Sequence, residues 1–192
     1  TTMNWILASG SPRRRELLEM LGVPDLTIRP AKGPERATPG AGPEQTVREL
    51  ALHKAQEAAQ TCTPEDIVIG ADTIVYLDGV ILGKPKDTAD AARMLAALSG
   101  REHTVYTGVA VLRGGEMRLA AEHTAVRFRT LTPAEIARYI ATGEPMDKAG
   151  AYGIQGRGAL FVAHLDGDYF NVMGLPLCRL GQLLNELGVE LL

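Results

Sequence analysis

The segment Ile67–Leu77 (IVIGADTIVYL) is almost continuously apolar, and a single carboxylate, that of Asp72, interrupts it. An apolar run without alternation predicts a central strand that is covered on both faces. A buried carboxylate without a partner costs several kcal/mol, so Asp72 needs a lysine, a divalent metal or a polarised water beside it. The alternative is an aspartate at a break in the strand that makes a local turn bond.

Apolar runs alternate with amphipathic stretches along the whole chain, which predicts an α/β fold with a mixed, twisted sheet and flanking helices. The two-residue turns Asp78-Gly79 and Gly114-Gly115 predict hairpins. We expect strands at residues 5–8, 67–77, 104–112 and 117–128, and helices at residues 12–22, 43–60, 87–99, 132–141 and 175–187. The Pro- and Gly-rich residues 30–43 predict a loop, either a lid or a plain connection.

Composition and net charge limit the classes of partner that the chain is expected to bind. Its 192 residues, 45% hydrophobic and 22% charged, are typical of a globular domain. The net charge of -3 argues against a surface for polymeric nucleic acid, although clustered arginines can still hold a small anion. The absence of a long apolar run and of a signal-peptide pattern predicts a cytoplasmic chain with no membrane partner. Cys62 and Cys178 lie far apart and are expected to be reduced.

Three arginines follow a turn of small residues near the N-terminus. Ser11 is in position to cap a helix that Pro12 opens, and Arg13, Arg14 and Arg15 occupy its first turn. The helix dipole disfavours each cation there by roughly 0.3 to 1 kcal/mol. An anion bound between the helix N–H groups, the serine hydroxyls and the guanidinium groups would offset that cost. The alternative is a solvated basic turn.

Two lysines are further candidates for binding an anion. On a helix over residues 43–60, Lys54 falls inside the apolar stripe, between Ala51 and Ala58. Such a lysine either snorkels outward or meets a counter-charge, and in a cleft it can pair with a phosphate. Lys84 precedes Pro85, which restricts the backbone and therefore the directions open to the ammonium group. On its own, this second lysine belongs to a common kind of loop.

Residues 143–158 contain five glycines. This density suits close approach of the backbone to a flat ligand, and the Gln155 amide could read an edge of a base. The alternative is a glycine-rich surface loop. His53 and His103 are expected on exposed faces or loops, and no histidine has a partner at the spacing of metal ligands.

Five stretches, in this order, resemble the Maf family of nucleotide pyrophosphatases, whose fold is similar to that of inosine triphosphatase. They are LASGSPRRRELLEMLG, ADTIVYLDGVILGKPKD, SGREHTVYTGVAV, GEPMDKAGAYGIQGRG and GDYFNVMGLPL. The resemblance covers nearly the whole chain. It implies one domain over residues 1–192, with two lobes around a central cleft, and a homodimer.

The resemblance also implies roles for particular residues. A phosphate loop, two cleft lysines, an acidic catalytic residue and a base-reading residue match Ser9, Arg13 and Arg14, then Lys54 and Lys84, then Asp72, then Gln155. Glu35 matches the acidic residue of the loop after the second strand, and with Asp72 it would hold Mg²⁺ or Mn²⁺. Asp72 would be either the base that activates water or a ligand of the activating metal.

The implied substrate is a nucleoside triphosphate, which water converts to the monophosphate and pyrophosphate. Arg13, Thr73 and Gln155 are similar to the branch of the family that acts on dTTP and UTP. Two alternatives stay open. One is the branch that acts on 7-methyl-GTP, and the other is a nucleotide-binding regulator of septum formation without turnover.

Overall fold

The computed structural model describes residues 3–192, which divide into two compact units. Within the described range, unit 1 comprises residues 3–72, Thr107–Glu122 and Gly174–Leu192, and unit 2 comprises Thr73–Tyr106 and His123–Met173. The strands form a seven-stranded sheet in the order β2 (Thr27–Ile28), β1 (Trp5–Leu7), β3 (Ile67–Leu77), β5 (Glu102–Arg113), β6 (Glu116–Phe128) and β7 (Val162–Asp166), and β4 (Val80–Leu82) pairs with β3. Parallel and antiparallel pairs both occur, so the predicted α/β class with a mixed sheet is confirmed.

The strands of unit 1 centre on β3. Strand β1 (Trp5–Leu7) pairs in parallel with β2 (Thr27–Ile28) and with β3 (Ile67–Leu77), whose bounds are those predicted. Strands β5 (Glu102–Arg113) and β6 (Glu116–Phe128) are slightly longer than predicted, and the expected Gly114-Gly115 turn joins them. The second halves of β3 and β6 and the first half of β5 belong to unit 2.

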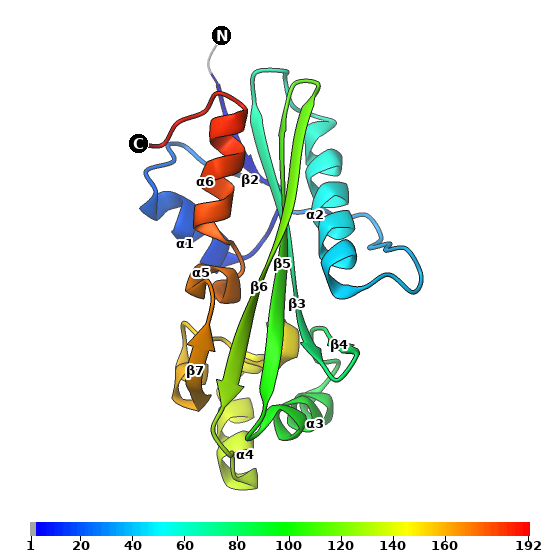
Figure 1. Ribbon diagram of the computed structural model, residues 1–192, viewed down its shortest axis with the longest axis vertical. Coiled ribbons are helices and arrows are strands. Elements are labelled where there is room, and N and C mark those ends of the chain that lie inside the picture. Colours follow the sequence, from blue (N-terminus) through cyan, green and yellow to red (C-terminus); the bar gives the residue numbers. More distant parts are fainter. Residues whose placement is uncertain (1–2) are drawn as a thin grey trace. The chain divides into compact units, whose positions relative to one another are not determined.

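Three helices belong to unit 1 (Figure 1): α1 (Pro12–Met20), α2 (Pro43–Ala59) and α6 (Leu177–Glu186). Each lies within the predicted range and is one to three residues shorter. The Ser11 hydroxyl caps α1 as expected, because it accepts a hydrogen bond from the Arg14 N–H. Alanines of α2 pack on the sheet in a buried cluster that contains Ile6, Ala8, Ala51, Ala55, Ala58, Val68 and Ala110.

Helix α2 approaches the sheet so closely that two strand positions have no room for a side chain. A Cβ atom on Gly70 would overlap the carbonyl oxygen of Ala51, and one on Gly108 would overlap that of Val47. Glycine in the interior of a strand often marks such a close approach of another backbone. These contacts fix the position of the α2 backbone against β3 and β5. They therefore also fix the positions from which the side chains of α2 extend.

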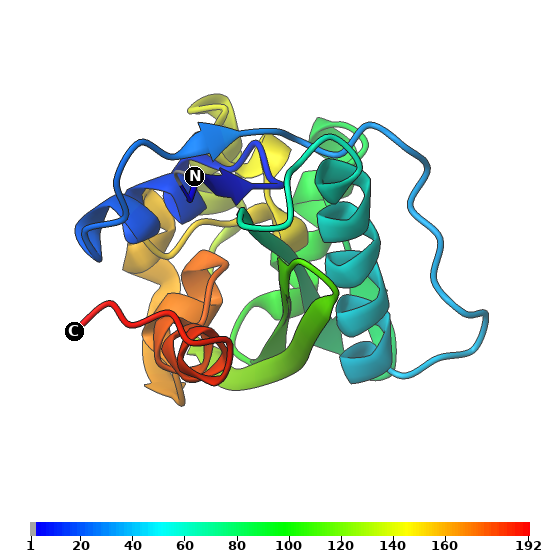
Figure 2. The same cartoon turned by 90° about the horizontal axis from the view of Figure 1, so that it is seen from above.

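The Pro- and Gly-rich loop over residues 30–42 runs alongside α2 (Figure 2) and is tied to it by hydrogen bonds. The N–H groups of Lys32 and Gly33 each donate to the Glu57 carboxylate at 2.7 Å. The N–H and hydroxyl of Thr38 each donate to the Glu49 carboxylate at 2.7 Å. Since the loop has no buried apolar core of its own, these carboxylates determine its path.

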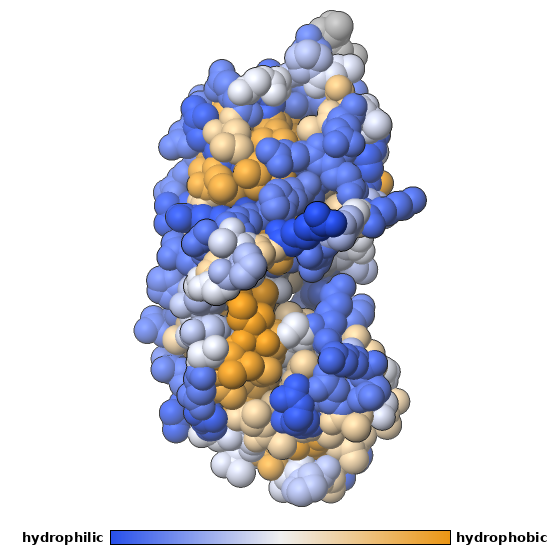
Figure 3. Space-filling model, turned by 90° about the vertical axis from the view of Figure 1, so that its right-hand side faces the viewer, coloured by the Kyte–Doolittle hydropathy of each residue, from blue (hydrophilic) through white to orange (hydrophobic). Residues whose placement is uncertain are grey.

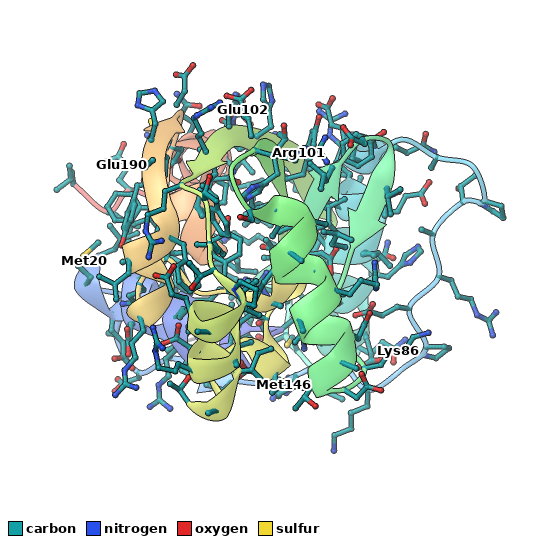
Figure 4. All side chains as sticks on the ribbon, turned by 90° about the horizontal axis from the view of Figure 1, so that it is seen from below. Met20, Lys86, Arg101, Glu102, Met146 and Glu190 are labelled. Atoms are coloured by element: carbon teal, nitrogen blue, oxygen red, sulfur yellow. The ribbon has the colours of Figure 1, made fainter. Side chains whose placement is uncertain are left out.

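Unit 2 contains more short elements than the sequence predicts. Its helices α3 (Thr88–Leu98) and α4 (Pro133–Ala141) are within one residue of their predicted bounds and pack on each other. The elements β7 (Val162–Asp166), α5 (Tyr169–Met173), η1 (Glu144–Asp147), η2 (Ala149–Ala151) and η3 (Arg157–Phe161) were not predicted. Figure 4 marks η1 by Met146, and η1 contacts both α3 and α4.

Strand β4 (Val80–Leu82) follows the predicted Asp78-Gly79 turn and pairs with the end of β3. Its residues Val80 and Ile81 are 55% and 41% exposed. Apolar side chains gather on the face drawn in Figure 3, in the part of unit 2 where β4 lies. The hairpin therefore presents an apolar edge to solvent within unit 2.

One expectation about the histidines is wrong. His53 is exposed as predicted, but His103 is only 2% exposed. Its ring packs edge-on against Phe128 and Tyr152, and its Nε2 lies 2.6 Å from the Tyr152 hydroxyl. Burial lowers the pKa of His103 to about 4, so the ring is neutral at physiological pH.

Cys62 is partly buried and Cys178 is exposed, and the structure pairs neither of them in a disulfide. Over residues 3–192, no helix has the length and apolar character that crossing a bilayer requires.

Candidate active site

Asp72 lies in β3, at the end of the part of that strand that belongs to unit 1, and is 7% exposed. Lys54 Nζ donates a 2.7 Å hydrogen bond to its Oδ1. Its Oδ2 is buried and accepts no hydrogen bond from any residue in the described range 3–192. Burial raises the pKa of Asp72, and the charges of Lys54 and Arg14 partly offset that rise. Of the three kinds of partner that the sequence left open for Asp72, the structure contains the lysine. The second carboxylate oxygen, Oδ2, has no hydrogen-bond partner within residues 3–192.

Of the two alternatives for Lys54, the structure shows the one in which its ammonium group meets a counter-charge. Its side chain is 19% exposed, and besides Asp72 it meets Glu35, with Nζ 3.2 Å from Oε1. Glu35 lies in the loop over residues 30–42, and its own side chain is mostly exposed. One ammonium group therefore joins a buried carboxylate of the sheet to an exposed carboxylate of the loop.

Arg14 is half-buried, and its guanidinium group is hydrogen-bonded to two residues outside α1. Its Nη1 donates to the Ser9 hydroxyl at 2.9 Å, and its Nε donates to the Gly174 carbonyl at 2.6 Å. Ser9 is itself buried, and its hydroxyl also accepts from the Ser11 N–H at 3.2 Å. Burial lowers the pKa of Arg14 to about 10 against the opposing effect of Asp72, so the guanidinium group stays charged at neutral pH.

The other two arginines differ from Arg14. Arg15 is exposed and forms a 2.8 Å ion pair with Glu19, one turn further along α1. Arg13 is half-buried, and its positive charge contributes to the lowered pKa of Arg14. The solvated basic turn that the sequence left open therefore describes Arg15, whereas Arg14 is hydrogen-bonded to Ser9 and Gly174. In unit 1, the predicted residues form two sets of contacts, Ser9 with Arg14 and Lys54 with both Asp72 and Glu35. The positive charge of Arg14 also acts on Asp72 and lowers its pKa.

The remaining predicted site residues belong to unit 2. Thr73 follows Asp72 in β3 and is half-buried, whereas Lys84 and Gln155 are exposed. Lys84 lies in the loop between β4 and α3, and the adjacent Gly83 carbonyl accepts a 3.1 Å hydrogen bond from the Gly150 N–H. Within unit 2, the lysine loop is thereby attached to the glycine-rich segment that carries Gln155.

Residues 4–187 match the family model described as Maf-like protein. The chain belongs to this family. It is 56% identical over 187 residues to a dTTP/UTP pyrophosphatase of Moorella thermoacetica, covering 96% of this chain and 95% of that protein. It is 53% identical over 183 residues to a dTTP/UTP pyrophosphatase of Symbiobacterium thermophilum, covering 95% and 93% respectively.

The fold of this Maf-like chain has a counterpart among solved structures. A HAM1 protein from Coxiella burnetii aligns with a TM-score of 0.52 and 18% identity, covering 96% of this chain and all of that one. At that level of identity, the likeness concerns the fold alone. It agrees with the inosine-triphosphatase-like architecture that the sequence resemblance implies.

The carboxylates of this Maf-like chain suit a metal that is bound partly by substrate. Within residues 3–192, no three histidine, cysteine or acidic side chains gather as a metal cluster. Mg²⁺ commonly needs only one or two carboxylates, because phosphate oxygens and waters complete its octahedral shell. The unbonded Asp72 Oδ2 and the exposed carboxylate of Glu35 meet that smaller requirement.

The glycine-rich segment of this family member is not an exposed surface loop throughout. Gly150, Gly153 and Gly158 are buried, and their missing side chains make room for the chain's own atoms. A Cβ atom on Gly150 would lie 2.6 Å from a methyl carbon of Val75, for example. Ligand approach is therefore not needed to explain these glycines.

Tyr139 and Glu144 lie beside this segment, and the sequence did not predict a role for either residue. Their side chains bind the backbone on both sides of Gln155. The only signal in the sequence is a Tyr and a Glu five positions apart at the end of a helix, and that spacing has no recognised meaning.

Unit 1 also contains a groove of about 570 Å³, and none of the predicted site residues lines it. It lies where the C-terminal end of α2 meets the β5–β6 turn, and its lining includes Ala59, Cys62, Leu112 and Met117. The groove is therefore distinct from the set of contacts around Asp72.

Proposed function

We propose that this Maf-like chain hydrolyses dTTP and UTP, each to the nucleoside monophosphate and pyrophosphate. Water attacks the α-phosphorus, the bond to the bridging oxygen breaks, and the proton released by water passes to a base. Support comes from the names of relatives that are 56% and 53% identical over nearly the whole chain. The same family resemblance supports a cytoplasmic homodimer, which light scattering and cell fractionation would test.

The observation that carries the mechanism is the asymmetry of the Asp72 carboxylate. Lys54 holds Oδ1, while the buried Oδ2 has no hydrogen-bond donor in residues 3–192. An oriented carboxylate with one available oxygen suits general-base catalysis, in which it accepts the proton of the attacking water. In this proposal Lys54 is the residue that orients the base and keeps it ionised despite its burial.

Cationic side chains suit the second requirement of phosphoryl chemistry, the stabilisation of charge. Arg14 stays charged and is held rigidly by Ser9 and Gly174, so it can bind phosphate oxygens without losing much conformational freedom. Arg13 and Lys84 are assigned phosphate binding on the family resemblance. When bound, Mg²⁺ or Mn²⁺ would add neutralising charge to the phosphates, and Glu35 would hold it. Asp72 would hold it as well in the alternative in which its Oδ2 is a metal ligand and not the base.

Gln155 is proposed as the residue that reads the pyrimidine base, with Arg13 and Thr73 as further determinants of specificity. The Gln155 side chain is exposed, and its amide offers both donors and an acceptor. Thymine and uracil present a carbonyl-imide edge that pairs with such an amide. The assignment rests on the family resemblance together with this chemistry.

The proposal is tested by pyrophosphate release from dTTP, UTP, CTP, GTP and 7-methyl-GTP, with Mg²⁺ and with Mn²⁺. Asp72→Asn should still bind nucleotide and should lose at least ~100-fold in kcat, the magnitude of a general base. The matched control is Asp25→Asn, the same change at an exposed position of unit 1. Bound nucleotide without product in the wild type, or near-normal turnover by Asp72→Asn, would overturn the proposed activity or the proposed base, respectively.

A further inference from the structure

The segment Gly153–Gly158, which contains Gln155, is held by two side chains from elsewhere in unit 2. One is Tyr139 in α4 and the other is Glu144 in η1. Neither is among the residues to which the family resemblance assigns a role. Their contacts lie on the two sides of Gln155 along the chain.

The Glu144 carboxylate binds the backbone after Gln155. Its Oε1 accepts from the Arg157 N–H at 2.9 Å, and its Oε2 accepts from the Gly158 N–H at 3.0 Å. The hydroxyl of Tyr139 donates to the same Oε2 and accepts from the Gly153 N–H at 3.0 Å. The phenol and the carboxylate together therefore bind the backbone on both sides of Gln155, and we call this pair the clamp.

The clamp is itself fixed in place. The backbone carbonyl of Glu144 accepts a 2.8 Å hydrogen bond from Lys148 Nζ, and its N–H donates to the Thr142 hydroxyl at 3.2 Å. The ring of Tyr139 is buried and packs edge-on against Phe161, with 4.9 Å between the ring centroids. Both side chains thus start from positions with little freedom.

Glycines in the segment leave the space that the clamp occupies. A Cβ atom on Gly156 would overlap the Glu144 carboxylate, and one on Gly158 would lie 2.9 Å from the Tyr139 hydroxyl. These two glycines are therefore explained by an internal carboxylate and phenol.

The clamp depends on the ionised form of Glu144. Burial raises the pKa of this carboxyl, but hydrogen bonds from Tyr139, Arg157 and Gly158 outweigh that effect and leave the pKa below its ordinary value. An ionised carboxylate offers acceptors to all three donors, whereas an amide has only one oxygen. Replacing Glu144 by glutamine therefore leaves the shape nearly unchanged and removes acceptors.

We propose that Glu144 and Tyr139 are positioning residues that set the preference for pyrimidine nucleotides by fixing the backbone around Gln155. This inference rests on the proposed function, in which Gln155 reads the base. The clamp does not touch the reacting phosphates in this proposal, so its loss should affect the choice of base more than the chemical step.

The test is the ratio of kcat/KM for dTTP to that for GTP in five proteins: wild type, Glu144→Gln, Tyr139→Phe, Gln155→Ala and the double variant Glu144→Gln/Gln155→Ala. The loss of a charge-assisted hydrogen bond predicts a ratio lowered by ~10-fold or more in Glu144→Gln, with kcat for dTTP within a few-fold of wild type. Tyr139→Phe, which removes one hydroxyl, should shift the ratio in the same direction and covers the case in which Glu144→Gln does not fold.

The double variant tests whether the clamp acts through Gln155. Its selectivity should equal that of Gln155→Ala, because coupled residues are not additive. The control is Glu135→Gln, which removes a carboxylate at the start of α4 that binds Arg129 and does not contact the segment. Glu135→Gln should lower the melting temperature and leave the ratio unchanged.

The outcomes distinguish a failure of the proposed function from a failure of the clamp proposal. A wild-type enzyme without preference for dTTP and UTP overturns the proposed function and the clamp proposal with it. A selective wild type whose Glu144→Gln and Tyr139→Phe variants keep the wild-type ratio overturns the clamp proposal alone. Additive effects of Glu144→Gln and Gln155→Ala overturn the assignment of the clamp to Gln155.

Discussion

The side chain of Arg14 is hydrogen-bonded to the backbone carbonyl of Gly174, 160 positions later in the chain, with 2.6 Å between Nε and the oxygen. Its Nη1 is bound to Ser9. A single arginine thus joins the start of α1 to the segment that leads into α6, and it does so with a charge that stays in place at neutral pH.

Replacing this arginine by lysine should weaken nucleotide binding although the charge is kept. Lysine lacks the planar fork that reaches Ser9 and Gly174 together, so Arg14→Lys should raise KM for dTTP by ~10-fold or more. Arg15→Lys is the matched control in the same turn, because Arg15 is exposed and its side chain pairs with Glu19 of the same helix. Equal KM values for the two variants would contradict a special role for Arg14.

Removing the partner of Asp72 should destabilise the fold, and removing both charges should restore part of the loss. Lys54→Met leaves the carboxylate buried without its 2.7 Å hydrogen bond, which should cost about 2 kcal/mol of unfolding free energy after allowance for partial exposure. Lys54→Met/Asp72→Asn should be more stable than Lys54→Met in urea unfolding at pH 7. If the double variant is the less stable of the two, the unpaired charge of Asp72 is not the cause of the instability of Lys54→Met.

The close approach of α2 to β5 predicts that Gly108→Ala is strongly destabilising. The added methyl group would overlap the Val47 carbonyl, and backbone on both sides leaves little room for adjustment. Overpacking of this kind costs about 1 to 3 kcal/mol or more, measured by thermal or urea unfolding. Gly115→Ala is the control, because nothing lies within 4 Å of a Cβ atom at that position. Similar unfolding free energies for both variants would mean that α2 can shift away from the sheet.

The buried His103 should make the fold sensitive to acid. Because burial lowers its pKa from 6.5 to about 4, the unfolded chain binds a proton between those pH values and the folded chain does not. Stability therefore falls as the pH drops from 6.5 towards 4, by up to about 3 kcal/mol from this residue. His103→Gln removes the titration, so its unfolding free energy should depend less on pH in that window.

His53→Gln is the control for this measurement, because it is the same substitution at an exposed histidine. A His103→Gln variant with the pH slope of the wild type would show that other groups cause the acid sensitivity.

Local signals in the sequence were sufficient for the central strand and for the main helices. The largely apolar run predicted the bounds of β3, and the cap at Ser11 predicted the start of α1. Burial of Asp72 against a lysine was among the stated alternatives, since a charge inside an apolar run demands a partner. The five short elements of unit 2 were not foreseen, because each is too brief for a periodic pattern to appear.

Features that depend on distant contacts were beyond the sequence. Arg14 and Arg15 are neighbours of the same type, and contacts with Ser9 and Gly174 distinguish the half-buried Arg14 from the exposed Arg15. His103 was expected to be exposed, but Phe128 and Tyr152 cover it. The clamp around Gln155 likewise requires Tyr139 and Glu144 to meet a backbone more than ten residues away.

Helix α2 makes two kinds of contact at once: Val47, Ala51 and Ala55 face the sheet, while Glu49 and Glu57 bind the loop over residues 30–42. Inserting one residue between Glu49 and Lys54 would rotate one end of the helix by about 100° relative to the other. Neither set of contacts could then be kept without losing the other. Insertions and deletions in proteins of this fold should therefore fall outside α2. The β5–β6 turn, in contrast, can vary in length without disturbing the contacts of Lys54 with Asp72 and Glu35.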